Sequence, residues 1–112
     1  MSARLPAHLW VSAYIRRCNG AGKPAVLVRR GEAMGGIVLI RVDYLDGKGQ
    51  ILSPFRNMDG EKIWLRALGA EPKPWADTQA YIERQEKRDP DFWLIDVEAG
   101  DGDPLLDEPI EG

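Results

Sequence analysis

The stretch VLVRRGEAMGGIVLIRV, residues 26–42, joins two apolar runs through an arginine pair and three glycines. Runs rich in valine and isoleucine that are bounded by glycine are typical of β-strands. Gly31 and Gly36 have the separation of the glycines in a phosphate loop, but Ile37 and Val38 stand where that loop needs a lysine and a hydroxyl residue. We therefore interpret the segment between the two runs as a hairpin turn or a strand connection.

Turn dipeptides divide the residues that follow into short strands. Asp46-Gly47 and Asp59-Gly60 are pairs that supply positive φ in tight hairpin turns. Residues 24–66 therefore predict an antiparallel meander of about four strands. Pro54 marks the third strand as an edge strand or an interrupted one, because proline cannot donate to a sheet ladder.

A helix is predicted on each side of this meander. Residues 9–22 fit a strand alternation as well as a helical stripe, and the terminal sequence Asn19-Gly20-Ala21-Gly22 favours the helix. The apolar stripe of this helix consists of Trp10, Val11, Tyr14, Ile15 and Cys18. Residues 71–90 give a second helix, because Pro74 suits a first turn and Pro90 cannot continue a helix. The run DFWLIDV then predicts a final strand.

Together these elements predict an α+β fold: helix, antiparallel meander of about four strands, helix and final strand, with the helices mainly on one sheet face. A chain of 112 residues is long enough for one domain with its own core. We expect a single compact domain over residues 1–100. Residues 101–112 are expected to be an acidic, weakly ordered C-terminal tail.

The order of motifs along the chain resembles a small bacterial family. The segments that carry the resemblance are LWVSAYIRRCNGAG, VLVRRGE, DGEKIW, YIERQEKRDPDFWLIDVE and LLDEP, in that order. They are similar to the alphaproteobacterial family catalogued as domain of unknown function 1491, over nearly the whole chain. The resemblance implies a compact, stand-alone bacterial protein, and it supplies no activity and no catalytic residues.

Composition favours a cytoplasmic protein. Cys18 is the single cysteine, so an intrachain disulfide cannot form, which suits a reducing compartment. The first ten residues lack the apolar stretch of a signal peptide. The uninterrupted aliphatic runs are far shorter than the roughly 20 residues that a membrane span needs. We therefore expect no membrane segment.

The residues predict no catalytic site, no cofactor and no metal site. One cysteine and one histidine cannot make a zinc site alone. The carboxylate-rich segment that starts at Asp101 departs from the EF-hand pattern, with Leu105 fifth and Leu106 where glycine is needed. Cys18 lies on the apolar stripe and is expected to be buried and unreactive. An enzyme of unfamiliar type, with a small-molecule pocket between helix and sheet, stays an alternative.

Charge is divided unevenly along the chain. Residues 1–56 hold nine Lys/Arg and three Asp/Glu, and residues 57–112 hold six and fifteen. Such asymmetry fits a basic binding face, two halves that attract each other, or a solvated acidic tail. Arginine binds phosphate bidentately and stacks on bases, so RNA binding is the main functional alternative. Its candidate ligand-binding residues are Arg16, Arg17, Arg29, Arg30 and Arg41.

Two observations argue against nucleic acid and favour protein association. Adjacent arginines of a strand point to opposite faces, and an isoelectric point near 5.1 opposes general nucleic-acid affinity. Phe92 and Trp93 place one large aromatic on each face of the final strand, so one could cover a helix while the other meets a partner. We therefore expect a non-enzymatic protein that binds a protein partner or forms a homo-oligomer.

Overall fold

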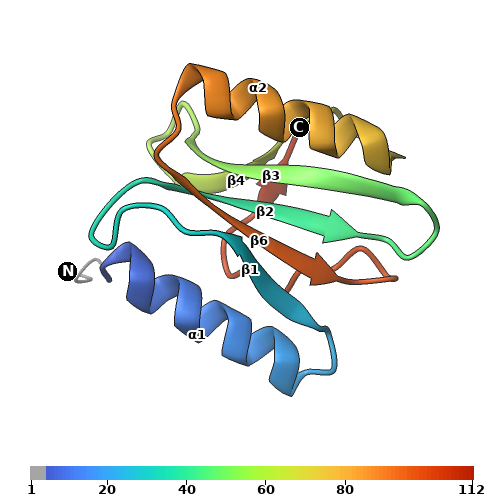
Figure 1. Ribbon diagram of the computed structural model, residues 1–112, viewed down its shortest axis with the longest axis horizontal. Coiled ribbons are helices and arrows are strands. Elements are labelled where there is room, and N and C mark those ends of the chain that lie inside the picture. The colour runs from blue at the N-terminus through green and yellow to red at the C-terminus, as the bar shows by residue number, and fades with distance from the viewer. Residues whose placement is uncertain (1–4) are drawn as a thin grey trace.

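The computed structural model describes residues 5–112, which fold into a mixed sheet between two helices (Figure 1). The α+β class is confirmed. Along the described chain the elements are α1 (Ala7–Gly20), β1 (Ala25–Arg29), β2 (Ile37–Asp43), β3 (Lys48–Arg56), β4 (Lys62–Arg66), β5 (Lys73–Pro74), α2 (Trp75–Arg88), β6 (Phe92–Glu98) and β7 (Ile110–Glu111). None of the helices in this part of the chain is long and apolar enough to cross a membrane.

The strand order β1-β6-β2-β3-β4-β7 corrects the predicted four-stranded meander. β6 lies between β1 and β2, antiparallel to the first and parallel to the second. Only β2, β3 and β4 form an antiparallel meander, and β5 adds a short pairing to β3. The first four residues of β6 are all buried, so this strand belongs in the interior of a sheet rather than at its end. Gly31–Gly36 is therefore a connection between strands that do not pair, not a hairpin turn.

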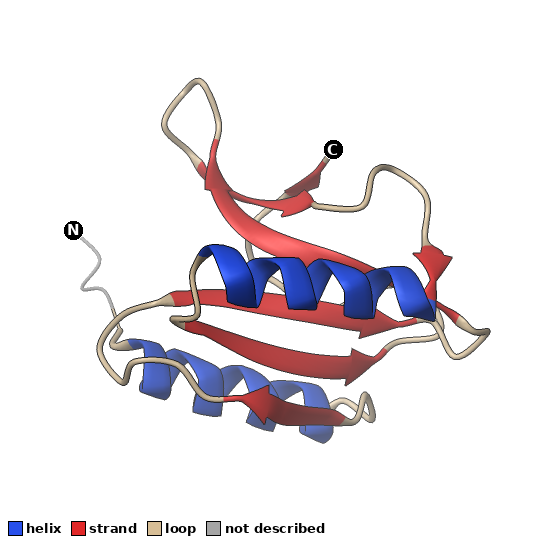
Figure 2. Ribbon diagram, turned by 45° about the horizontal axis from the view of Figure 1, so that its top comes forward, coloured by secondary structure: helices blue, strands red, loops and turns tan. Residues whose placement is uncertain are grey.

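The helices lie on opposite faces of the sheet, not mainly on one (Figures 1 and 2). α1 packs on a cluster that includes Trp93 and Ile95, and α2 packs on a cluster that includes Phe92 and Leu94. Successive strand residues point to opposite faces, and here successive residues are both apolar. A sheet that is apolar on both faces needs a covering layer on each face. The prediction that both helices lie mainly on one face was therefore wrong.

Local signals predicted both helices and both tight turns. Val11, Tyr14 and Cys18 are the buried residues of α1, and Cys18 is completely buried, as predicted. Each glycine of the two Asp-Gly turns has positive φ, +88° at Gly47 and +79° at Gly60. Both predicted hairpins are confirmed.

The C-terminal segment packs on the domain, unlike the tail predicted for residues 101–112. Its apolar side chains, Leu105, Leu106 and Ile110, contact the α1-side cluster. The Tyr14 hydroxyl donates to the Pro104 carbonyl at 2.6 Å, and β7 pairs in parallel with β4. The tail was predicted from the acidic composition of the segment, which gives no information about the packing of these three apolar side chains.

Candidate functional site

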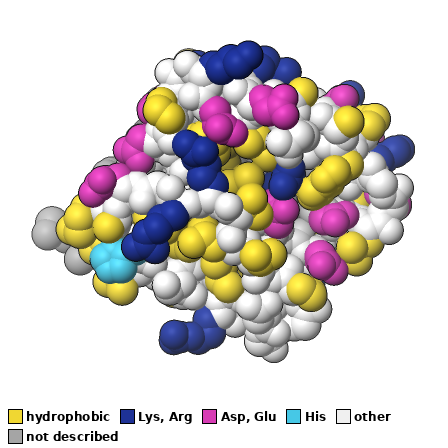
Figure 3. Space-filling view, viewed as in Figure 1, with side chains coloured by type: hydrophobic (Ala, Val, Ile, Leu, Met, Phe, Trp, Pro, Cys, Tyr) yellow, Lys and Arg dark blue, Asp and Glu magenta, His cyan; other side chains and the backbone are white. Residues whose placement is uncertain are grey.

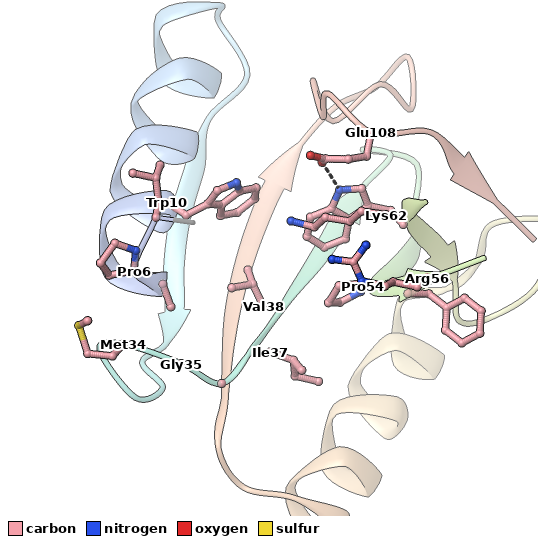
Figure 4. Close-up of a pocket in the computed structure, with 15 residues that line it drawn as sticks. Pro6, Trp10, Met34, Gly35, Ile37, Val38, Pro54, Arg56, Lys62 and Glu108 are labelled. Atoms are coloured by element: carbon pink, nitrogen blue, oxygen red, sulfur yellow. Dashed lines mark hydrogen bonds between the residues drawn. The ribbon is translucent and has the colours of Figure 1, made fainter. Parts of the chain in front are cut away.

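An open groove of about 1130 Å³ lies on the α1 side of the sheet, between the start of α1 and the β3–β4 hairpin (Figure 4). β3 and β4 rise away from β2 at this end of the sheet (Figure 2). Most lining residues are apolar, from α1 and its approach, from β2 and the loop before it, and from the hairpin. They include Pro6, Ala7, Trp10, Met34, Ile37, Val38, Pro54 and Trp64.

The groove begins where the β2–β3 ladder stops. Pairing runs from Asp43–Gly49 to Ile40–Leu52, and extending that register by two residues sets Val38 opposite Pro54. In an antiparallel ladder every second pair exchanges two hydrogen bonds. The Tyr44 N–H donates to the Lys48 carbonyl at 3.1 Å, so Ile40–Leu52 and then Val38–Pro54 are pairs of this kind.

Proline at position 54 explains why the two strands separate. Proline has no N–H, so Pro54 cannot donate to the Val38 carbonyl that faces it across the register. The β2–β3 register ends two residues earlier, at Ile40–Leu52, and Val38 and Pro54 lie on opposite sides of the groove (Figure 4). The third strand itself is not interrupted: β3 continues through Pro54 to Arg56 and pairs there with β4. Beyond Leu52 it has no ladder to β2, so this part of β3 is an edge strand, which was the other predicted alternative. The carbonyl of Val38 therefore lies in the groove without the N–H donor that a residue other than proline would supply.

Two tryptophans support the groove from α1 and β4. Trp10 stacks on Tyr14, with ring centroids 5.1 Å apart, and meets the Trp64 ring at 5.8 Å. Trp64 is 2% exposed, and its Nε1–H donates to Glu108 Oε1 at 2.9 Å. Each ring is held by a neighbour, so the apolar wall is preorganised.

The loop between β1 and β2 forms the rim beside α1. Trp93 Nε1–H donates to the carbonyls of Glu32 and Gly35, and the His8 backbone N–H and Nδ1–H both donate to the Ala33 carbonyl. Met34 stands at the tip of this anchored loop with 69% of its surface exposed. A flexible apolar side chain is therefore presented to the groove from a fixed backbone.

Charge gathers at the hairpin end of the groove. Arg56 and Lys62 are a cross-strand pair of the hairpin, and neither forms an ion pair within residues 5–112. Arg56 Nη1 donates to the Gly60 carbonyl at 2.8 Å, whereas Glu108 uses one oxygen for Trp64. The described lining at this end of the groove therefore holds two cations and one carboxylate, and the hairpin turn beyond it also carries Asp59 and Glu61.

The predicted arginine patch does not form on one surface. Arg29 lies over the Phe92 ring at 4.4 Å, and Arg30 over the Trp93 ring at 5.1 Å. Because those two rings belong to the clusters on opposite sheet faces, the two arginines diverge. Phe92 and Trp93 are themselves 0% and 1% exposed, so both are core residues and neither ring can meet a partner.

The remaining predicted arginines have separate environments. Arg17 pairs with Asp107 at 3.1 Å on the α1 side, and Arg16 is exposed on the same helix. Arg41 is 6% exposed and pairs with Asp96 at 2.8 Å beneath α2. Arg29 also pairs with an acid, Glu86 of α2, at 3.4 Å. Three of the five arginines thus pair with acidic residues of the C-terminal half. Attraction between the two halves of the chain was the alternative to a basic binding face.

Sequence reasoning did not assign Trp10, Val38, Arg56, Lys62 or Glu108 to a site. The available signal was Pro54 within a β-rich run, which indicated a break in pairing but not what borders the break. Within the described residues no group of three or more His, Cys, Asp and Glu is placed to hold a metal ion. The groove is therefore best described as an apolar binding surface with a cationic end.

Comparison with known proteins places this architecture in a family. A family model described as protein of unknown function (DUF1491) matches residues 5–107. A crystal structure of a DUF1491 family protein from Caulobacter crescentus CB15 is similar, with 35% identity, coverage of 96% of this chain and 99% of that chain, and a TM-score of 0.84.

Two solution structures are also similar. An NMR structure of a DUF1491 family protein from Caulobacter crescentus CB15 has 35% identity, covers 99% of this chain and 100% of that chain, and gives a TM-score of 0.82. Protein Atu0922 from A. tumefaciens has 25% identity, 87% coverage of both chains and a TM-score of 0.73. No curated protein matches the chain.

Proposed function

The chain belongs to the DUF1491 family, which specifies a fold and no activity, and from the groove we propose a non-enzymatic protein that binds an extended segment of another protein. The observation that carries this proposal is the Val38 carbonyl opposite Pro54. An extended segment that adds to a sheet supplies backbone N–H donors to such acceptors. A backbone N–H of the bound segment would donate to the Val38 carbonyl in place of the N–H that Pro54 lacks.

The apolar lining supports a peptide rather than a small polar ligand. Trp10, Ile37 and Met34 offer aromatic, branched and flexible surfaces around the open acceptor. Ligand sites combine an apolar lining with a few placed polar groups, and methionine is common on surfaces that adapt to peptide side chains. Side chains of an extended segment would rest on these residues.

The ionisable groups of the groove favour binding over catalysis. Among residues 5–112 they are Arg56, Lys62 and Glu108, and the carboxylate of Glu108 accepts from the buried Trp64 N–H. A general acid or base is tuned by its environment and lies within reach of a reacting group. A cationic end beside an apolar floor instead suits recognition of charge and shape.

Self-association through the exposed edge of the sheet is disfavoured by Asn19. The edge strand β1 carries two exposed valines, Val26 and Val28, and hydrophobic side chains are visible between the two helices on this side of the molecule (Figure 3). However, Asn19 Oδ1 accepts the Ala25 N–H at 2.9 Å, and its Nδ2 donates to the Ala25 carbonyl at 3.3 Å. A side chain thus occupies backbone groups that another strand would need.

Two exposed methionines allow a matched test of the groove. Met34 lines it, whereas Met58 is fully exposed at the hairpin turn and does not. A random linear peptide library displayed on phage would be selected on the wild-type protein, and enriched peptides measured by fluorescence anisotropy. We expect micromolar binding that M34E weakens about tenfold or more, and M58E leaves unchanged. Equal binding by M34E and wild type, or no enriched peptide, would contradict the proposal.

A further inference from the structure

The chain's own C-terminal segment shows which chemistry this sheet face accepts. Leu105 and Leu106 pack on the α1-side cluster, next to the groove. The acids that follow them are both held, Asp107 by Arg17 at 3.1 Å and Glu108 by the indole N–H of Trp64 at 2.9 Å. An irregular segment that combines apolar and acidic residues, with Leu105 at φ +59° and a bend at Asp107 and Glu108, therefore already occupies the neighbouring part of this face.

The open part of the face offers a pair of cations that no acid of residues 5–112 holds in an ion pair. Arg56 and Lys62 lie directly opposite each other on the hairpin, and Figure 4 shows them on the side of the groove across from Trp10. Like charges opposite each other in a sheet are unfavourable unless an anion lies between them. A carboxylate can accept from the forked guanidinium and the ammonium together.

The strand register relates this cationic pair to the open acceptor. Pro54 pairs with Trp64, and the Arg56–Lys62 pair comes two residues further along the hairpin, on the same face. A residue that donates to the Val38 carbonyl is level with Pro54. Because the strand repeat is two residues, its second neighbour toward the hairpin tip is level with Arg56 and Lys62.

We propose that the partner segment is an acidic-apolar strand in which an apolar residue is followed two positions later by Asp or Glu. This inference rests on the proposed function. The apolar residue lies against Trp10 beside Val38, and its backbone N–H donates to the Val38 carbonyl. The acidic residue then pairs with Arg56 and Lys62. The order follows from a segment that takes the antiparallel place that β3 leaves beside β2.

A reversal of charge tests this assignment directly. The same phage library would be selected in parallel on wild type, on the double variant R56E/K62E and on K48E. Lys48 is exposed on β3 and outside the groove, so K48E controls for the reversal of a single charge on the same strand, half the charge change of the double variant. Circular dichroism checks that each variant is folded. We expect wild type and K48E to enrich apolar-x-acid peptides, and the double variant to enrich apolar-x-Lys or apolar-x-Arg peptides.

Measured peptide affinities for the wild-type protein and for R56E/K62E make the same test quantitative. A wild-type-selected peptide should bind R56E/K62E about tenfold or more weakly, and replacing its acid by the amide should remove most of that difference. Peptides that M34E weakens but that carry no acidic preference would overturn this inference and leave the proposed function standing. Peptides that M34E does not weaken would overturn both. Acid-before-apolar enrichment would overturn the antiparallel register.

Discussion

The indole N–H of Trp64 donates to the carboxylate of Glu108 at 2.9 Å, and this bond joins β4 to the C-terminal segment. Trp64 is almost wholly buried, so its N–H has no access to bulk water. Glu108 also lines the groove. The same contact therefore closes the core beneath the segment and fixes the boundary of the candidate site.

Replacing Glu108 separates these contributions. Glu108→Ala should lower the free energy of unfolding by about 1–3 kcal/mol, because it leaves the Trp64 N–H buried without an acceptor. Glu108→Gln keeps an acceptor oxygen and should cost much less. Urea unfolding followed by tryptophan fluorescence measures both. Equal stability of the two variants would show that the Trp64 bond contributes nothing.

Burial of two ionisable groups predicts a loss of stability at alkaline pH. Desolvation raises the pKa of Tyr14 far above its usual range and also raises the pKa of the Cys18 thiol. Both groups are neutral in the folded protein and ionise more readily in the unfolded chain. Their contribution is therefore complete below the unfolded thiol pKa of about 8.5 and is lost as pH rises above it.

The measurement is the urea midpoint between neutral and strongly alkaline pH. It should fall progressively on the alkaline side, and less steeply in Cys18→Ala than in the wild-type protein. Cys18→Ala also loses packing, so the comparison uses the slope with pH rather than the absolute stability. A midpoint that is constant through the alkaline range would contradict the assigned burial of both groups.

The edge function of Asn19 predicts an effect on association. Asn19→Ala removes both side-chain bonds to Ala25 and frees the backbone of β1. We expect destabilisation of about 1 kcal/mol and concentration-dependent dimers in sedimentation velocity. Val26→Lys in the same background should suppress those dimers, because it places charge on the exposed edge. A monomeric Asn19→Ala protein at high concentration would refute this role.

The helices and tight turns could be predicted from the sequence because residues close together along the chain determine them. The Asn19-Gly20 terminus and the two Asp-Gly pairs each act within a few residues. The position of β6 was not readable, since a strand shows that it is apolar on both faces but not which strands flank it. The predicted meander was therefore wrong at β1.

The candidate site was only partly predictable for a related reason. Pro54 signals a missing donor, yet the acceptor it would have met, Val38, follows from the β2–β3 register. The approach of Trp10 to this opening and the return of Glu108 are contacts between distant parts of the chain. In the same way, the pairing of Arg41 with Asp96 needed both strands in place before charge asymmetry could be interpreted.

The missing N–H of Pro54 opens the groove in which the proposed partner segment binds. Pro54→Val supplies an amide at a position that suits a β-branched residue, so the β2–β3 ladder should extend to Val38. The decisive measurement is anisotropy with a wild-type-selected peptide, paired with amide hydrogen exchange at position 54. We expect a protected amide at position 54 and peptide binding about tenfold or more weaker than that of the wild-type protein. A protected amide with undiminished peptide binding would contradict it.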